Sequence, residues 1–386
     1  FNGGSAITGY QVHCEPSGKA SGSASPLTVQ GLTNGQPVTC KVQASNRMGH
    51  SESSLLSPEV TPARRPDVVQ DAVVTGKAAA LTVSFEAPAD NGAEITAFTV
   101  QAVPGENPRP SVPAKTVVVK KSTQPILVAG LVNGITYSVT VQASNRKGHS
   151  ERSHPATALV STVPDAPSVS HVADHDQSIV VSFDAPEFDG GKPVTRYKAL
   201  CGDVAGTGTE SPIRVLGLAN GQSYTCTVTA VNDNGESPAS IPSDSVTPAT
   251  KPSGVRGVSV KHRDSALEFF FTEPEHDGGA PVQSYRAICG DQQVTWKAAT
   301  VVRVLDGLQN GKPYSCDIYA KNRKGWGVPA LAPSEIPSRA SDPVTDLFIQ
   351  PILNGVHASF DPPDFDGGDA VKGYLLECEN QNTHTK

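Results

Sequence analysis

The chain repeats one pattern along its whole length, with a period of about ninety residues. An aromatic residue opens the same short segment at five places, and in four of them a cysteine follows four positions later. The aromatic residues are Tyr10, Phe98, Tyr197, Tyr285 and Tyr374. A period of this size fits one small β-sandwich and is well above the roughly 33 to 47 residues of helical solenoid repeats. The 386 residues are therefore expected to form a string of small domains.

A tight turn is expected after each of the first four of these segments. The pentapeptide Gly-Leu-x-Asn-Gly recurs there, and its Asn-Gly pair tolerates positive φ. It occupies residues 31–35, 130–134, 217–221 and 307–311. The stretch from Tyr137 to Ala143 then alternates apolar and polar side chains, which indicates a half-buried strand. With 35 Gly, 32 Pro and 5% aromatic residues, the composition also favours short strands joined by turns.

Three further motifs keep the same register. A strand ends in Phe-x-x-Pro, because proline has no N–H to continue a ladder, an Asp-Gly-Gly triplet follows, and Asn-x-x-Gly closes the alternating strand. The phenylalanines are Phe85, Phe183, Phe271 and Phe360, and the triplets lie at 189–191, 277–279 and 366–368. Together with Gly-Leu-x-Asn-Gly-x-x-Tyr, these motifs resemble the fibronectin type III repeat.

The resemblance covers essentially the whole chain and implies an all-β fold, a tandem array of fibronectin type III, immunoglobulin-like β-sandwiches. Two positions depart from the family pattern. Phenylalanine stands where strand B usually has tryptophan, and Val38 replaces the strand F tyrosine of the first repeat. Both departures predict slightly less well-filled cores.

Five repeats follow from this frame. A partial repeat without strands A and B spans 1–62, complete repeats span 65–163, 164–249 and 251–340, and a partial repeat with strands A to C spans 342–386. The joints between them are short and proline-bearing, which predicts a semi-rigid, elongated array. Because the first and last repeats are partial, we expect the chain to be a piece of a longer polypeptide. If the chain truly ended there, the partial repeats would expose apolar residues such as Val12, Val42, Phe360 and Leu375.

Seven cysteines fit the same frame. The family alignment puts one member of each pair on strand C and the other on strand F, which are neighbours. The pairs are Cys14 with Cys40, Cys201 with Cys226, and Cys289 with Cys316. In the second repeat both members are absent together, which favours disulfides, while pairs of reduced core thiols remain the alternative. Zinc is disfavoured because each pair supplies two of four ligands, and the partner of Cys378 would follow Lys386.

The second repeat has a longer connection between strands C and F. We expect an exposed loop from Pro104 to Pro110, cut first by a protease near Glu106, and an extra edge strand within Lys115 to Lys121 that flanking lysines shield.

Several chemistries are disfavoured. A net charge of -7 leaves no basic surface for a nucleic acid backbone, and no apolar run is long enough for direct insertion in a membrane. Asp-Gly-Gly offers one carboxylate, whereas calcium takes six or more oxygens, so the triplet is interpreted as a turn. The ten histidines are scattered without a nucleophile and carboxylate beside them. We therefore expect no cofactor, no metal and no enzyme.

The loops between strands F and G are the candidate binding sites. Three of them are basic, and the third repeat instead has an acidic loop at 232–236. The basic and aromatic candidates are Arg47, Arg146, Lys147, Arg323, Lys324 and Trp326. Such loops would suit an acidic protein or polysaccharide, with an exposed Trp326 stacking on a ring, although a solvated turn is the simpler interpretation.

The favoured function is an extracellular, non-catalytic structural or adhesive spacer array in a surface or secreted protein, or one that packs laterally or end to end into a fibre. Two alternatives remain: accessory spacer modules of a secreted polysaccharide-degrading enzyme, and an intracellular cytoskeletal or ciliary scaffold with reduced thiols. Strand donation between partial repeats is disfavoured because both carry the Tyr-x-x-x-Cys strand.

Overall fold

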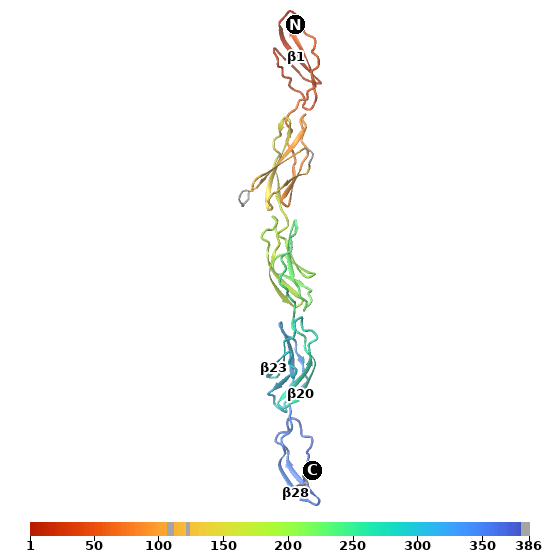
Figure 1. Ribbon diagram of the computed structural model, residues 1–386, viewed down its shortest axis with the longest axis vertical. Helices are drawn as coiled ribbons and strands as arrows, with labels where there is room; N and C mark the ends of the chain where they lie inside the picture. The colour runs from red at the N-terminus through yellow and green to blue at the C-terminus, as the bar shows by residue number, and fades with distance from the viewer. Residues whose placement is uncertain (106–111, 121–123, 380–386) are drawn as a thin grey trace. The chain divides into compact units, whose positions relative to one another are not determined.

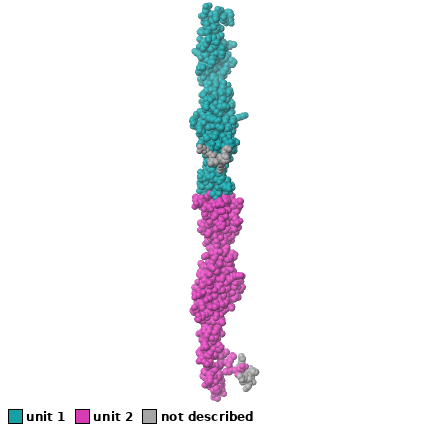
Figure 2. All heavy atoms as spheres, turned by 90° about the vertical axis from the view of Figure 1, so that its left-hand side faces the viewer, with its two compact units in different colours: residues 1–166, 185–196, 229–238 teal, residues 167–184, 197–228, 239–386 magenta. Residues whose placement is uncertain are grey.

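The computed structural model describes residues 1–105, 112–120 and 124–379, and every regular element in these residues is a β-strand (Figure 1). The described chain divides into two compact units, coloured separately in Figure 2. Unit 1 comprises residues 1–166, 185–196 and 229–238, and unit 2 comprises 167–184, 197–228 and 239–386. The division therefore passes through the stretch proposed as the third repeat.

Residues 1–62 contain a single four-stranded antiparallel sheet with the order β2-β1-β3-β4. Its strands are β1 (Ile7–Glu15), β2 (Lys19–Gly22), β3 (Thr39–Asn46) and β4 (Gly49–His50). The expectation of exposure holds for Val42, but Val12 is buried. The expectation was wrong for Val12, which lies in an inner strand of the sheet between Ala20 of β2 and Val42 of β3.

Residues 65–163 form two antiparallel sheets around one core. One sheet has the order β5-β6-β9, and the other has the order β11-β10-β7-β8 with β12 paired to β10. The strands are β5 (Val73–Lys77), β6 (Ala80–Ser84), β7 (Ile95–Pro104), β8 (Lys115–Lys120), β9 (Ile126–Ala129), β10 (Ile135–Asn145), β11 (Gly148–His149) and β12 (Ala156–Val160). Phe98 and Tyr137 are completely buried between the sheets.

The predicted edge strand is present as β8, but it is not an addition to the repeat. It pairs with β7 as β2 pairs with β1, so the same position is filled in the first repeat without an insertion. The sequence suggested an extra strand because the connection between strands C and F is longer in the second repeat, but the added length lies in the connection around β8 and not in a new strand. The cleavage site expected near Glu106 and the terminal Lys121 lie outside the described residues.

The stretch 164–249 has a three-stranded sheet of order β13-β14-β17 and a four-stranded sheet of order β16-β15-β18-β19. The strands are β13 (Ser168–His175), β14 (Ser178–Asp184), β15 (Arg196–Cys201), β16 (Val204–Gly208), β17 (Ile213–Leu216), β18 (Cys226–Asn232) and β19 (Gly235–Glu236). The strand order is that of the preceding stretch, apart from the missing counterpart of β12.

Residues 251–340 repeat the plan with sheets of order β20-β21-β24 and β23-β22-β25-β26, where β27 also pairs with β25. The strands are β20 (Arg256–Arg263), β21 (Ala266–Thr272), β22 (Ser284–Cys289), β23 (Gln292–Lys297), β24 (Val304–Asp306), β25 (Cys316–Asn322), β26 (Gly325–Trp326) and β27 (Ala330–Leu331). In the described part of the last stretch, residues 342–379, the only strands are the pair β28 (Thr345–Ile352) and β29 (Gly355–Asp361). Leu375 there is exposed, as expected, while Phe360 is half-buried against Tyr374.

The Gly-Leu-x-Asn-Gly-x-x-Tyr motif joins the two sheets of a repeat through side-chain hydrogen bonds. In the second repeat the Tyr137 hydroxyl accepts the N–H of Val132 at 3.1 Å, and Asn133 Oδ1 accepts the N–H of Ala79 at 2.8 Å. Ala79 lies in the β5–β6 turn with a φ of 52°, and Gln177, Ser265 and Asn354 in the equivalent turns have φ values of 48 to 60°. The equivalent side chains Tyr224, Asn220, Tyr314 and Asn310 make the same bonds.

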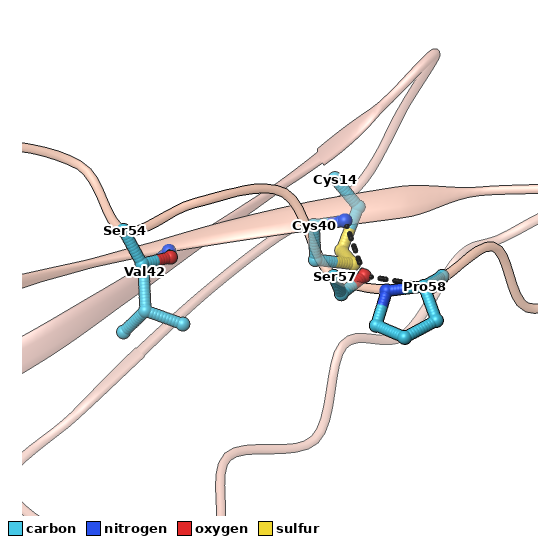
Figure 3. Close-up of a disulfide and its surroundings, with 6 residues drawn as sticks. All are labelled: Cys14, Cys40, Val42, Ser54, Ser57 and Pro58. Carbon is cyan, nitrogen blue, oxygen red and sulfur yellow. Dashed lines mark hydrogen bonds between the residues drawn. A yellow bond between two sulfur atoms is a disulfide. The ribbon is translucent and has the colours of Figure 1, made fainter.

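A serine every third residue replaces an ordinary last strand in the first repeat. Ser51, Ser54 and Ser57 each donate a backbone N–H to β3 and accept one from β3 with Oγ. Figure 3 shows Ser57 Oγ accepting the N–H of Cys40 and donating to the carbonyl of Pro58. Three residues per step is the period of a polyproline II helix, so this edge of the sheet offers no regular ladder to another strand.

Candidate functional site

The three predicted cysteine pairs are disulfide-bonded in the structure. The bonds join Cys14 to Cys40, Cys201 to Cys226, and Cys289 to Cys316. Each bond links adjacent strands of one sheet, and the first and third connect residues that lie directly opposite in register. Cys378 is an exposed free thiol. The pairs could be assigned from sequence because both members of a pair occupy fixed positions of the repeat.

The second repeat fills the same register position without sulfur. Ala102 lies opposite Val139, and both side chains are fully buried. The shorter apolar pair therefore keeps the two strands in the same alignment as the bonded cysteines of the other repeats.

The F–G loops are tight turns built on their first asparagine. Asn145 Oδ1 accepts the N–H of Lys147 at 2.8 Å, and Asn46, Asn232 and Asn322 make the same bond two residues on. This geometry directs the two residues after the asparagine outward. Arg47, Arg146 and Lys147 are accordingly exposed.

The loop of the fourth repeat has a different environment, because it binds an acidic residue of the third repeat. Arg323 and Lys324 both lie against the carboxylate of Asp174 at the end of β13, at 2.7 and 2.9 Å. Lys324 Nζ also donates to the Asp174 carbonyl at 2.7 Å, and Arg323 donates to the carbonyl of Thr247 at 2.6 Å. These four residues belong to one compact unit, and they join β13 to the β25–β26 turn.

The electrostatics of Asp174 reflect these two cations. Burial alone would raise the pKa of its carboxyl group, but the neighbouring Lys324 and Arg323 outweigh burial and hold the pKa below its usual value of 3.8. The carboxylate is therefore ionised at neutral pH. Nothing local in the sequence indicated this cluster, since Asp174 and Lys324 are 150 residues apart.

Trp326 is not the exposed stacking platform that the sequence suggested. It is half-buried, opposite Lys321 in the β25–β26 pair. The Arg286 guanidinium lies 4.3 Å from the centre of its ring, and Lys321 Nζ lies 5.5 Å from it. The expectation was wrong because the hairpin places the indole beside β25, where neighbouring cations contact its ring.

The Asp-Gly-Gly triplets are turns. In each, the aspartate accepts the N–H of the second glycine at 2.8 Å, which is an Asx-type turn bond. Among the described residues, no group of three His, Cys, Asp or Glu side chains is placed to hold a metal ion.

Comparison with known proteins agrees with this architecture. The fibronectin type III domain model matches residues 68–158 and 165–246. These two stretches of the chain are fibronectin type III domains. These matched residues contain all of β13–β19 and all of β5–β12 except the last two residues of β12.

Relatives with fibronectin type III repeats include proteins of several kinds. Myomesin-2 of Homo sapiens is 26% identical over 78% of this chain and 22% of its own length. Neural cell adhesion molecule 1-A of Xenopus laevis is 28% identical over 44% of this chain and 17% of its own length. Netrin receptor DCC of Rattus norvegicus is 24% identical over 91% of this chain and 26% of its own length. The chain thus spans about a quarter or less of these relatives.

Two of these relatives are by name an adhesion molecule and a receptor, and none of the three is named as an enzyme. In the part of the chain that the structure describes, no helix is long and apolar enough to cross a membrane.

Proposed function

We propose that this chain is a non-catalytic structural or adhesive spacer array, carried in a longer surface or secreted protein or fibre. One observation supports this most directly: Arg323 and Lys324, on a loop suited to a partner, instead hold Asp174 of a neighbouring repeat. A loop used to join repeats serves the array itself. The adhesion molecule and the receptor among the relatives support an outer location and protein partners.

The disulfides also favour the extracellular setting over an intracellular scaffold, because thiols stay reduced in the cytosol. Thiol trapping in the native protein tests this point. The protein is denatured without reductant, treated with an alkylating reagent and analysed by peptide mass spectrometry. Within this segment, only Cys378 should be modified. Modification of Cys289 and Cys316 in protein taken directly from its source would instead support the intracellular alternative.

The exposed loops of the first two repeats are a secondary proposal. Arg47, Arg146 and Lys147 are exposed and are the residues we assign to contact with an acidic protein or polysaccharide. Heparin provides a defined polyanion for the test. Retention on a heparin column at physiological salt, abolished by Arg146→Glu with Lys147→Glu but unaffected by Lys198→Glu, would establish a binding function. The absence of retention would leave the spacer function alone.

A screen against soluble polysaccharides distinguishes the accessory-module alternative from the spacer function. Accessory modules of a polysaccharide-degrading enzyme would be expected to bind its substrate or to occur beside a catalytic domain in the complete polypeptide. The intact protein should lack both properties if the chain is a structural spacer. Binding of an uncharged polysaccharide, or a catalytic domain in the complete polypeptide, would replace the spacer proposal with the accessory-module alternative.

A further inference from the structure

Three recurring motifs meet where one repeat ends and the next begins. They are the Asn-Gly turn that ends Gly-Leu-x-Asn-Gly, the double glycine or Asn-Gly between Phe-x-x-Pro and the next strand, and the asparagine that opens each F–G loop. The positive φ of these turns already favours glycine at the last position of the first two motifs. The contacts across the joints add a separate reason at the second glycine of each pair.

Backbone meets backbone across every joint. The turn glycine of one repeat lies against the second glycine of the next repeat's pair, and a Cβ added to that second glycine would collide with the turn. It would lie 2.3 Å from the Gly35 nitrogen if built on Gly92, 2.6 Å from Gly134 if built on Gly191, 2.3 Å from Gly221 if built on Gly279, and 2.5 Å from Gly311 if built on Gly368. Because the obstructing atoms belong to the main chain, no side-chain rotation removes the collision.

The turn glycine is held to the departing chain. In the third repeat, the Gly221 N–H donates to the Pro248 carbonyl at 2.9 Å. The equivalent bonds run from Gly35 to Pro62, from Gly134 to Val160 and from Gly311 to Pro337, at 2.7 to 3.0 Å. The turn and the start of the joint therefore form one surface.

The departing chain also bonds to the next repeat. Thr250 N–H donates to the Gly278 carbonyl at 2.8 Å, and a Cβ on Gly278 would lie 2.3 Å from the Thr250 carbonyl oxygen. The same bond is made by Thr162 with Gly190, Arg339 with Gly367, and Arg64 with Asn91. Asn91 substitutes for glycine here at a φ of 55°, a conformation that asparagine tolerates.

The F–G asparagine closes the joint from the other side. The Asn322 amide donates to the carbonyls of Thr250 in the joint and Asp277 in the next turn, both at 2.7 Å. Asn232 bonds in the same way to Thr162 and Asp189, and Asn145 to Arg64 and Asp90, at 2.8 to 3.0 Å. All three asparagines are buried, and each amide satisfies one carbonyl of the joint and one of the next turn.

We propose that these motifs form a directional docking surface on each repeat, whose partner is the Asn-Gly turn and departing chain of the preceding repeat, and that it sets the orientation of neighbours. This inference rests on the proposed spacer function and adds how neighbouring repeats of the spacer are held against each other. The division into compact units supports this proposal. Residues 185–196 and 229–238 form the third repeat's side of its joint with the second repeat, and they group with the second repeat in unit 1. Every joint described above thus lies within one unit.

The joint between the third and fourth repeats offers a matched pair of variants. Gly279 and Gly217 both have a φ of 83°, so alanine introduces the same backbone strain at either position. A Cβ on Gly279 would meet Gly221, whereas a Cβ on Gly217 would meet nothing within 4 Å. Only Gly279→Ala should therefore open the joint, and Gly217→Ala controls for strain.

The readout is the distance distribution between spin labels on the two repeats, in the full chain. Labels attached through unnatural amino acids at the exposed, equivalent positions Asp203 and Asp291 avoid the native cysteines. A single narrow distribution is expected for the parent and for Gly217→Ala. For Gly279→Ala, the width should at least roughly double, because repeats without a docked joint reorient freely.

A second variant guards against a folding defect in the glycine mutant. Asn322→Asp keeps the oxygen that accepts the Lys324 N–H but replaces the amide donor, and it should broaden the distribution in the same direction. Identical distributions for Gly279→Ala and Gly217→Ala would overturn the docking role. A parent distribution as broad as that of Gly279→Ala would also overturn it, while leaving a flexible spacer intact. A catalytic domain beside this segment in the complete polypeptide would count against the spacer function itself and would not alter these distances.

Discussion

The second and fourth repeats solve the same packing problem in different ways. The second repeat places the apolar pair Ala102 and Val139 opposite each other on β7 and β10, where the fourth repeat joins Cys289 to Cys316. Both repeats bury these positions completely or nearly so. Strand alignment therefore does not depend on the cross-link, and the disulfide adds stability to a register that packing already specifies.

The F–G loops of these two repeats differ as well. Arg146 and Lys147 are exposed, while Arg323 and Lys324 hold Asp174. Nearly identical loop sequences thus lie in different environments in this chain, since residues 1–62 contain no strand equivalent to β13, the strand that carries Asp174. The comparison predicts which changes will matter in each repeat.

The largest effect is expected from the core of the uncross-linked repeat. Phe98→Ala removes a fully buried ring that packs 4.8 Å from Phe85 and should destabilise the second repeat by about 3 to 5 kcal/mol. Hydrogen exchange resolved by peptide should show rapid exchange in β7 and β10 and little change in β22 and β25. Gln101→Ala on the same strand is the control. Equal acceleration in both repeats would contradict independent cores.

Removing the fourth repeat's cross-link should have the next largest effect. Cys289→Ser with Cys316→Ser opens a loop with a sequence separation of 27 and should cost about 3 kcal/mol by the chain-entropy model. Reductant should destabilise the parent's fourth repeat and leave the second unaffected, as followed by denaturant unfolding.

The apolar pair of the second repeat can be transferred to sharpen this result. Cys289→Ala with Cys316→Val copies Ala102 and Val139 and should recover part of the loss seen with the serine pair, because the site is buried and apolar. If the serine and apolar pairs were equally stable, packing would not replace the cross-link.

Neutralising the charged contact should have a moderate effect. Asp174→Asn should destabilise the contact between β13 and the β25–β26 turn by about 1 kcal/mol, since both cations are partly exposed. The pKa of Asp174 is lowered on folding, so its contribution is present above the unfolded value near 3.8 and is lost as the pH falls through the lower folded value. Thermal unfolding between pH 2 and 7 measures this. A parent and mutant that stay equally stable at pH 7 would exclude the contribution, and Asp233→Asn is the exposed control.

The smallest effect is expected at the tip of the same loop. Trp326→His gives the fourth repeat the residue that the second has at His149 and removes the contact with Arg286. The loss should be about 0.5 to 1 kcal/mol. Arg286→Ala also removes a contact with Tyr319 and should cost at least as much. The double mutant should cost less than the sum, since both changes remove the contact between Arg286 and Trp326. Additive losses would mean that the cation and the ring do not interact energetically.

Much of the fold could be predicted because every landmark occurs several times. There is a local physical reason for each of the strand-ending prolines, the Asn-Gly turns and the buried tyrosines. Because each motif recurs at the same position of several repeats, a chance match is excluded. The cysteine pairs followed from the same register. The edge strand β8 was also predicted, but its equivalence to β2 was missed, because β2 (Lys19–Gly22) lacks the β-branched residues that signal a strand.

The candidate site was less accessible from sequence. Composition identified the basic loops, and local turn chemistry explains why Arg146 and Lys147 are exposed. The role of Arg323 and Lys324 depended on Asp174, which lies 150 residues before Lys324 and belongs to no recurring motif. Trp326 was misjudged for a related reason, since its contact with Arg286 depends on strands β22 and β25 being adjacent.

The sequence by itself determined the all-β class, the repeat period, the turns and the cysteine partners, because these depend on backbone preferences within a few residues and on periodicity. Only the tertiary structure decided which charged loops are exposed and what excludes a Cβ at the second glycine of each pair. A Cβ at Gly279 is excluded by the main chain of Gly221, in another repeat. Such a constraint exists only after the two segments have met.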